Sequence, residues 1–304
     1  MTPARIKAYF YLTLVALIWG IATPVIKYTL GGISPLPFLT YRFAISGVIG
    51  GIFLLFTARH LKTIFTNFLE VVLYGFLTTT FALGILFFGI EKTTVLDTAL
   101  ISAVGPLLTA LAGVVFLKET ITAREKLGIA VAFSGTLVTV FEPIFNGGLG
   151  SIQITGNFLV VGYLVVMAFS SILAKKLVRK DVDPLALTNV AFIVGFLTLL
   201  PFSLKQASAS QLTNQIVSLS PNFQLGVWYM AAISGTLGYA LWIRGQKTIE
   251  VSEAGVFNYL IPIFAAPLGV VWLGEKITPV FILGATLITI GVVIAEWKKR
   301  RKRS

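Results

Sequence analysis

The sequence contains one long stretch twice. Residues 106–128 read PLLTALAGVVFLKETITAREKLG, and residues 262–284 read PIFAAPLGVVWLGEKITPVFILG. In this register, at a shift of 156 residues, a proline, two glycines, a glutamate and a threonine coincide, and Gly135 lies over Gly291 further on. Similar composition alone would give scattered apolar matches. The rear parts of the two halves are therefore predicted to be copies of one unit. The front parts match more weakly at a shift of 149 residues, at Lys27, Pro35 and Leu36 over Lys176, Pro184 and Leu185.

The composition places this unit in a membrane. Of the 304 residues, 56% are hydrophobic and only 12% are charged, which is about half the charged share of a soluble domain. The apolar runs are each long enough to cross a hydrocarbon layer of about 30 Å as a helix, and a helix satisfies its own backbone hydrogen bonds in lipid. We expect an all-α polytopic membrane protein with ten transmembrane helices, at about 8–30, 36–58, 68–90, 95–117, 123–141, 156–176, 185–204, 223–245, 251–273 and 279–297.

Charge sets the expected orientation. With both termini in the cytoplasm, most lysines and arginines of the loops, and the basic tail 298–304, fall on the cytoplasmic side, as the positive-inside rule favours. We therefore expect a multi-pass protein of the plasma membrane. A unit of five helices enters the membrane in opposite directions in its two copies, which predicts a 5+5 inverted-topology repeat. The expected parts are a first repeat 1–143, an external linker 144–154 and a second repeat 155–297.

Local signals mark several helix ends. Thr122 and Glu125 form a capping-box pattern, and Thr278 followed by Pro279 is typical of a helix start. The segment 203–222 is rich in Ser, Gln and Asn and is predicted to be the longest external loop. The chain has no cysteine, which excludes disulfides and thiolate sites.

Two matched helix faces are the first candidates for a binding site. Ser102 and Asn258 are repeat partners, and each lies about one turn before a matched proline near the middle of its span. A proline inside a helix frees a carbonyl, and irregular backbone at membrane depth is tolerated where it faces protein or a watery cavity. The alternative is close helix packing through small residues.

Aromatic, hydroxyl and charged side chains inside the spans are further candidates. Trp19 lies mid-span and could stack on a substrate, or it could belong to the core. Arg42 is the one charge well inside an apolar run; it could serve function or extend to the interface. Asp97 and its partner Glu253 lie near helix starts, where capping competes with proton relay. The candidate substrate-binding residues are Trp19, Thr23, Arg42, Thr79, Ser102, Tyr239, Trp242 and Asn258. Thr79 belongs to the run Thr78-Thr79-Thr80, whose hydroxyls could instead bond back to their own helix.

Several of these motifs resemble a known family. Trp19-Gly20 followed by Lys27, Tyr41-Arg42-Phe43, and the repeated proline-to-glutamate pattern are similar to those of the drug/metabolite transporter superfamily, in its EamA-like ten-helix branch. The resemblance implies an exporter of amino acids or other metabolites. It also implies a central cavity lined by the first, third and fourth helices of each half, with spans five and ten at the back. The first span lacks the acidic residue through which four-helix multidrug members exchange protons.

The sequence thus predicts transmembrane transport of a small metabolite, an amino acid or a related compound, by export and alternating access. Lipid scrambling and a non-transporting membrane sensor are the alternatives. An intramembrane enzyme is disfavoured, because no nucleophile with a base and no metal cluster lies within the spans. The expected partners are a small-molecule substrate and membrane lipids. Neither a cofactor nor nucleic acid is expected.

Overall fold

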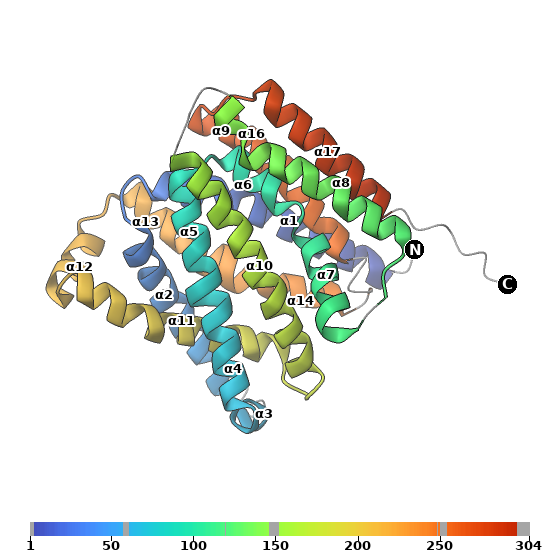
Figure 1. Ribbon diagram of the computed structural model, residues 1–304. Helices are drawn as coiled ribbons and strands as arrows, with labels where there is room; N and C mark the ends of the chain where they lie inside the picture. The colour runs from blue at the N-terminus through green and yellow to red at the C-terminus, as the bar shows by residue number, and fades with distance from the viewer. Residues whose placement is uncertain are drawn as a thin grey trace.

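A computed structural model describes residues 3–56, 61–118, 120–145, 152–247, 249 and 254–296. Within these ranges the chain is helical and contains no β-strand (Figure 1). Eight helical segments are long and apolar enough to cross a membrane. They are Pro3–Thr29, Pro35–Phe56, Phe68–Lys92, Val95–Leu117, Ile152–Val178, Pro184–Gln206, Val256–Leu273 and Pro279–Glu296. The expectation of a polytopic, all-α membrane protein is therefore confirmed.

The two other predicted spans are also helical but lie outside that group of eight. Helix α8 (Ala123–Val140) begins at the predicted capping box, in which Glu125 N donates to the Thr122 hydroxyl and Thr122 N donates to the Glu125 carboxylate. The segment 221–246 is made of α13 (Pro221–Trp228), a π-helix η3 (Tyr229–Leu237) and α14 (Gly238–Gln246). The number of ten spans stays a prediction.

Much of the segment expected to be a long loop, 203–222, is helical instead. Helix α11 (Pro184–Gln206) continues into this segment, and α12 (Ala209–Val217) follows. Helix α12 begins with a capping box in which Gln211 N donates to the Ser208 hydroxyl and Ser208 N donates to the Gln211 side chain. These bonds satisfy backbone donors at the helix start, so a polar composition did not mean absence of structure.

Corresponding helices in the two halves have matching bounds. The end of helix α10 (Ile152–Val178) follows the end of α1 (Pro3–Thr29) by 149 residues. Helix α16 (Ile261–Leu273) follows α7 (Gly105–Leu117) by 156 residues at both ends, and α17 (Pro279–Glu296) begins 156 residues after α8 begins. Lys118 and Gly274, which end α7 and α16, both adopt left-handed backbone. The third helix of each half contains a π-helical stretch, η2 (Phe76–Ala82) between α4 (Phe68–Gly75) and α5 (Leu83–Lys92), and η3.

Helices α8 and α17 lie side by side at one edge of the bundle (Figure 1). Their contact is made through glycines: a methyl group added at Gly135 would lie 2.8 Å from the carbonyl oxygen of Gly284, and one at Gly128 would lie 2.6 Å from that of Gly291. Small residues let helix backbones approach closely, which is typical of packing in membranes. Large apolar side chains such as Phe10, Leu55 and Val271 remain exposed around the bundle, as expected of a surface that faces lipid.

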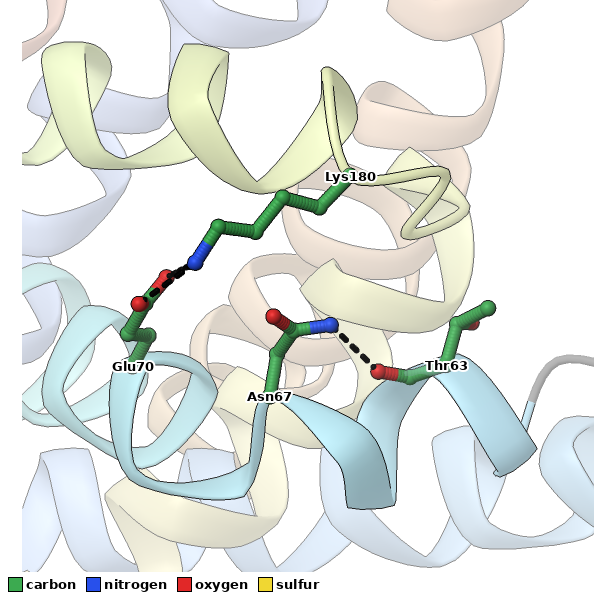
Figure 2. A network of polar contacts seen from close by, with 4 residues as sticks. All are labelled: Thr63, Asn67, Glu70 and Lys180. Atoms are coloured by element: carbon green, nitrogen blue, oxygen red, sulfur yellow. Dashed lines mark hydrogen bonds and ion pairs between the residues drawn. The ribbon is translucent and has the colours of Figure 1, made fainter.

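At another edge of the bundle a salt bridge joins the two halves. Lys180, which follows α10, donates to both carboxylate oxygens of Glu70 in α4, at 2.6 and 2.7 Å (Figure 2). Nearby, the Asn67 amide donates to the Thr63 carbonyl of the short helix α3 (Leu61–Thr66). Both charged side chains are more than 40% exposed, so this pair stabilises the fold by at most about 1 kcal/mol.

Candidate functional site

The π-helix η3 offers backbone carbonyls to its neighbours. In a π-helix the hydrogen bonds run from i to i+5, so the turn is wider than in an α-helix, and such stretches are frequent at functional sites. Three side chains bind η3 carbonyls: Trp19 Nε1 donates to Ser234 at 3.1 Å, Arg42 Nε donates to Met230 at 3.1 Å, and Ser46 donates to Ala231 at 3.2 Å. Helices α1 and α2 (Pro35–Phe56) of the first half are thereby bound to the third helix of the second half.

Arg42 is enclosed by protein. Its side chain is only 3% exposed, so it does not extend to the membrane interface, which was the alternative considered for it. The guanidinium carbon lies 5.2 Å from the centre of the Phe43 ring and 5.7 Å from that of Phe87 in α5. Its Nη1 atom is buried and has no hydrogen-bond partner among the residues that the structure describes. A buried donor without a partner is costly, which marks this group as unusual.

An aromatic group lies next to these η3 contacts. The Trp19 ring centre is 5.4 Å from that of Tyr239 and 5.4 Å from that of Trp242, both in α14. Tyr239 also meets Phe192 of α11 edge-on. The structure thus brings together three aromatic residues that the sequence proposed for one site. It adds Tyr163 of α10, which lies near Arg42 and Tyr239; nothing in its apolar surroundings in the sequence singled it out.

Ser102 and Asn258 lie where their helices are interrupted. Helix α6 (Val95–Ser102) ends at Ser102, and α7 begins three residues later; Asn258 belongs to the 3-10 helix η4 (Val256–Leu260), which leads into α16. Both side chains are half-buried. The α16 start lies against α1, because a methyl group at Gly20 would be 3.0 Å from the Ile261 carbonyl oxygen. The preceding helix η4, which carries Asn258, also contacts α1, where Phe257 packs against Tyr9 with ring centres 5.5 Å apart.

The two threonine candidates differ in their surroundings. Thr79 of η2 is buried, and its hydroxyl lies within hydrogen-bond distance of the carbonyls of Gly75, at 2.6 Å, and Ala191, at 3.0 Å. This is the bonding back to the helix that was the alternative for Thr79. Thr23 is half-buried in α1, one turn beyond Trp19. A substrate role for either residue stays a prediction.

A second polar cluster surrounds Asp97 in α6. Its Oδ2 atom accepts hydrogen bonds from Gln153 at 2.9 Å and Asn157 at 3.0 Å, both in α10, and from Thr93. The helix cap here is Thr94, whose hydroxyl accepts from Asp97 N. A cavity of about 180 Å³ adjoins the cluster and is also lined by Glu142, Lys276 and Thr278. Glu253, the repeat partner of Asp97, lies outside the described residues, as does His60. The described ranges contain no group of His, Cys, Asp and Glu that could hold a metal ion.

Comparison with known proteins relates the chain to transporters. The chain is 30% identical to the uncharacterized transporter YyaM of Bacillus subtilis, over 96% of this chain and 94% of that one. It is 26% identical to a protein of Salmonella typhimurium named "Probable amino-acid metabolite efflux pump", over 98% and 97% of the two chains, and equally to a protein of the same name from Escherichia coli.

The fold comparison agrees. A solved crystal structure superposes with a TM-score of 0.63 over 97% of both chains at 18% identity, which shows a common fold. The sequence pattern of the EamA-like transporters matches the chain twice, at residues 6–141 and 154–297. Since these two matches cover nearly the whole sequence, the chain belongs to the EamA-like transporter family.

Proposed function

We propose that this membrane transporter exports an amino acid or a related small metabolite by alternating access. Family membership supports carriage of a small solute, and relatives named as amino-acid metabolite efflux pumps support the substrate class and the direction. The observation that carries the proposal is the polar and aromatic group around η3. There α1 and α2 of the first half place Trp19 and Arg42 on the backbone of the second half. Binding sites of transporters with repeats lie at such an interface.

The architecture proposed for this mechanism is ten membrane helices in a 5+5 inverted repeat, with units 1–143 and 155–297. Two facts support it. The bounds of α7 recur in α16 and the start of α8 recurs in α17 at one shift, and the family pattern matches each half separately. Five helices per unit invert the second copy, so two similar halves can exchange conformations and open the site to each side in turn.

The proposed substrate site combines a few polar groups with aromatic walls. Arg42 and Asn258 supply polar recognition, and apolar pockets with few polar groups obtain specificity through those groups. The full set is Trp19, Thr23, Arg42, Thr79, Ser102, Tyr239, Trp242 and Asn258. Of these, Thr79 has the least support, because its hydroxyl bonds to backbone carbonyls.

We further propose that the chain lies in the plasma membrane with both termini in the cytoplasm, as its distribution of lysine and arginine favours. Single cysteines at Asn146 and Ser304 test this in a chain that has none of its own. An impermeant thiol reagent added to intact cells should label Asn146→Cys and leave Ser304→Cys unlabelled until the cells are opened. Labelling of both in intact cells would contradict the orientation.

Counterflow in proteoliposomes tests the transport function. Vesicles loaded with an excess of one unlabelled amino acid should accumulate the labelled form transiently, because a carrier exchanges it by alternating access. Trp19→Ala should reduce this exchange, whereas the matched control Trp228→Ala, at a side chain that is 47% exposed on the bundle surface, should not. Scrambling of a fluorescent lipid, measured in the same vesicles, distinguishes a lipid scramblase from a solute carrier. Lipid scrambling without exchange of any amino acid would overturn the proposal.

A further inference from the structure

The charge of Arg42 has no acidic partner in the described part of the chain. Among the described residues, the ionisable groups near the guanidinium are the hydroxyls of Tyr163 and Tyr239, and neither is a carboxylate. Ionised side chains inside membrane proteins are almost always paired or face a watery pathway. A fully enclosed guanidinium without a counter-ion therefore points to a negative charge that arrives with a ligand.

The geometry leaves one nitrogen of the guanidinium without an acceptor among the described residues. Nε is occupied by the Met230 carbonyl, and the rings of Phe43 and Phe87 lie beside the group. The buried Nη1 carries two N–H donors with no acceptor. The neighbouring hydroxyls come from α10 and α14, so the free donors lie among elements of both halves.

Resting on the proposed transport function, we infer that Arg42 binds the carboxylate of the transported solute and makes this carrier selective for solutes that carry a carboxylate. A planar guanidinium fork matches a carboxylate with two parallel hydrogen bonds, and such charge-assisted bonds are about twice as strong as neutral ones. The hydroxyls of Tyr163 and Tyr239 are additional donors nearby. The solute's carboxylate replaces the missing counter-ion, so the gain on binding is largest for groups of negative charge.

The same surroundings provide little for an ammonium group. Among the described residues, the aromatic faces of Trp19, Tyr239 and Trp242 could attract a cation, and such contacts contribute about 0.5 to 2 kcal/mol. A matched α-keto acid should therefore bind at least as tightly as the α-amino acid. The corresponding amine, which lacks the carboxylate, should bind far more weakly than both.

Two matched series of solutes test the inference on the purified full-length protein. The first is phenylpyruvate, phenylalanine and 2-phenylethylamine; the second is 4-methyl-2-oxopentanoate, leucine and 3-methylbutylamine. A ligand that binds only the folded state raises the melting temperature by mass action. In at least one series the keto acid and the amino acid should raise the melting temperature, while the amine leaves it unchanged.

Arg42→Gln tests whether the guanidinium binds the carboxylate. Its control is Arg244→Gln, at an exposed site in α14. Arg42→Gln should weaken carboxylate binding by about tenfold or more, whereas Arg42→Lys, which keeps the charge but loses the fork, should weaken it less. The ligand-free protein should not lose melting temperature in Arg42→Gln, because an unpaired buried charge is removed.

Three results would overturn the inference: an amine that stabilises the wild-type protein as much as its acid, no carboxylate that stabilises it, or an Arg42→Gln variant with unchanged carboxylate affinity. The comparison of acid with amine uses the wild-type chain, so it holds even where a variant fails to fold. Counterflow of neutral or cationic solutes in the same vesicles, with no carboxylate exchange, would remove the anion site and leave the carrier function. Absence of any exchange would remove both.

Discussion

The Glu275 carboxylate accepts a hydrogen bond from the backbone N–H of Val95 at 2.7 Å, and a second from that of Leu96 at 2.9 Å. A residue between α16 and α17 thus caps the first turn of α6. The helix before this turn, α5, is capped on the other side of the junction: Lys27 of α1 donates to the carbonyls of Ile90, Glu91 and Thr93, where α5 ends. Each charge lies at the helix end whose partial charge it complements. Side chains from both halves therefore hold the junction between α5 and α6.

Removing either charge should loosen this junction. Glu275→Ala leaves two backbone donors of α6 without an acceptor, and Lys27→Met leaves three carbonyls of α5 without their donor. Loss of a cap costs about 1 to 2 kcal/mol, so each variant should melt several degrees below the wild-type protein. Lys180→Ala is the control, because it removes an exposed pair of little energetic weight and should shift the melting temperature by no more than a degree or two.

The pH dependence of stability should carry the signature of Glu275. Burial raises the pKa of the Glu275 carboxyl above its ordinary value of 4.5, although the two N–H donors and Lys27 act in the opposite direction. At pH values between the pKa of Glu275 in the unfolded state and its pKa in the folded state, the native state binds more protons than the unfolded state. This contribution to stability is therefore present below the unfolded pKa and is lost as the pH rises through the folded pKa.

Thermal melts of the wild-type protein and Glu275→Gln, from about pH 4 to about pH 8, measure that contribution. The melting temperature of the wild-type protein, relative to that of Glu275→Gln, should fall as the pH rises through this window. A relative stability that instead grows with pH would show that the hydrogen bonds from α6 and the charge of Lys27 dominate over burial.

Helix positions and the repeat were accessible to sequence reasoning because their causes are local. The Thr122 and Glu125 capping box, for example, starts α8 where the pattern predicted. Ser208 and Gln211 form the same kind of signature, so α12 could have been found from it, but the polar composition favoured a loop. The π-helical stretches had no such signal. Tyr229–Leu237 packs against α1 and α2, and Phe76–Ala82 packs against α10 and α11; apolar periodicity does not report such contacts.

Packing between α8 and α17 should be intolerant of added volume. A methyl group at Gly291 would lie 2.6 Å from the carbonyl oxygen of Gly128, which cannot move without shifting the α8 backbone. Gly291→Val should therefore cost about 1 to 3 kcal/mol or prevent assembly, as overpacking does. Gly51→Ala in α2 is the matched control, since a methyl group there meets nothing within 4 Å. Unchanged melting temperature and yield for Gly291→Val would contradict the close approach of the two helices.

The site was only partly accessible from sequence because its contacts are long-range. Trp19 and Arg42 stood out as unusual residues for mid-span positions, but their partners, the carbonyls of Ser234 and Met230, lie about 190 to 215 residues away and are backbone atoms that every residue possesses. Tyr163 was missed for the same reason. Thr79 stood out as part of a threonine run, yet its hydroxyl is directed to the backbone of α4 and α11.

Two substitutions at Trp19 should separate its structural contribution from its contribution to substrate binding. Trp19→Phe keeps an aromatic ring beside Tyr239 and Trp242 but loses the N–H that binds the Ser234 carbonyl of η3. The lost hydrogen bond should cost about 1 kcal/mol of stability. Trp19→Ala removes the ring as well, so any stacking on the solute disappears with it.

We expect Trp19→Phe to melt a few degrees lower while its affinity for the amino acid that gives the strongest counterflow changes less than about threefold. Trp19→Ala should lose about tenfold in affinity or more, since aromatic contacts contribute about 1 kcal/mol beyond their buried area. Trp228→Phe and Trp228→Ala, at an exposed tryptophan in α13, provide matched controls for both changes. Binding is measured by isothermal titration and folding by thermal melts on the same samples. If both Trp19 variants lose stability and keep their affinity, the ring serves packing between α1 and α14 and does not face the solute.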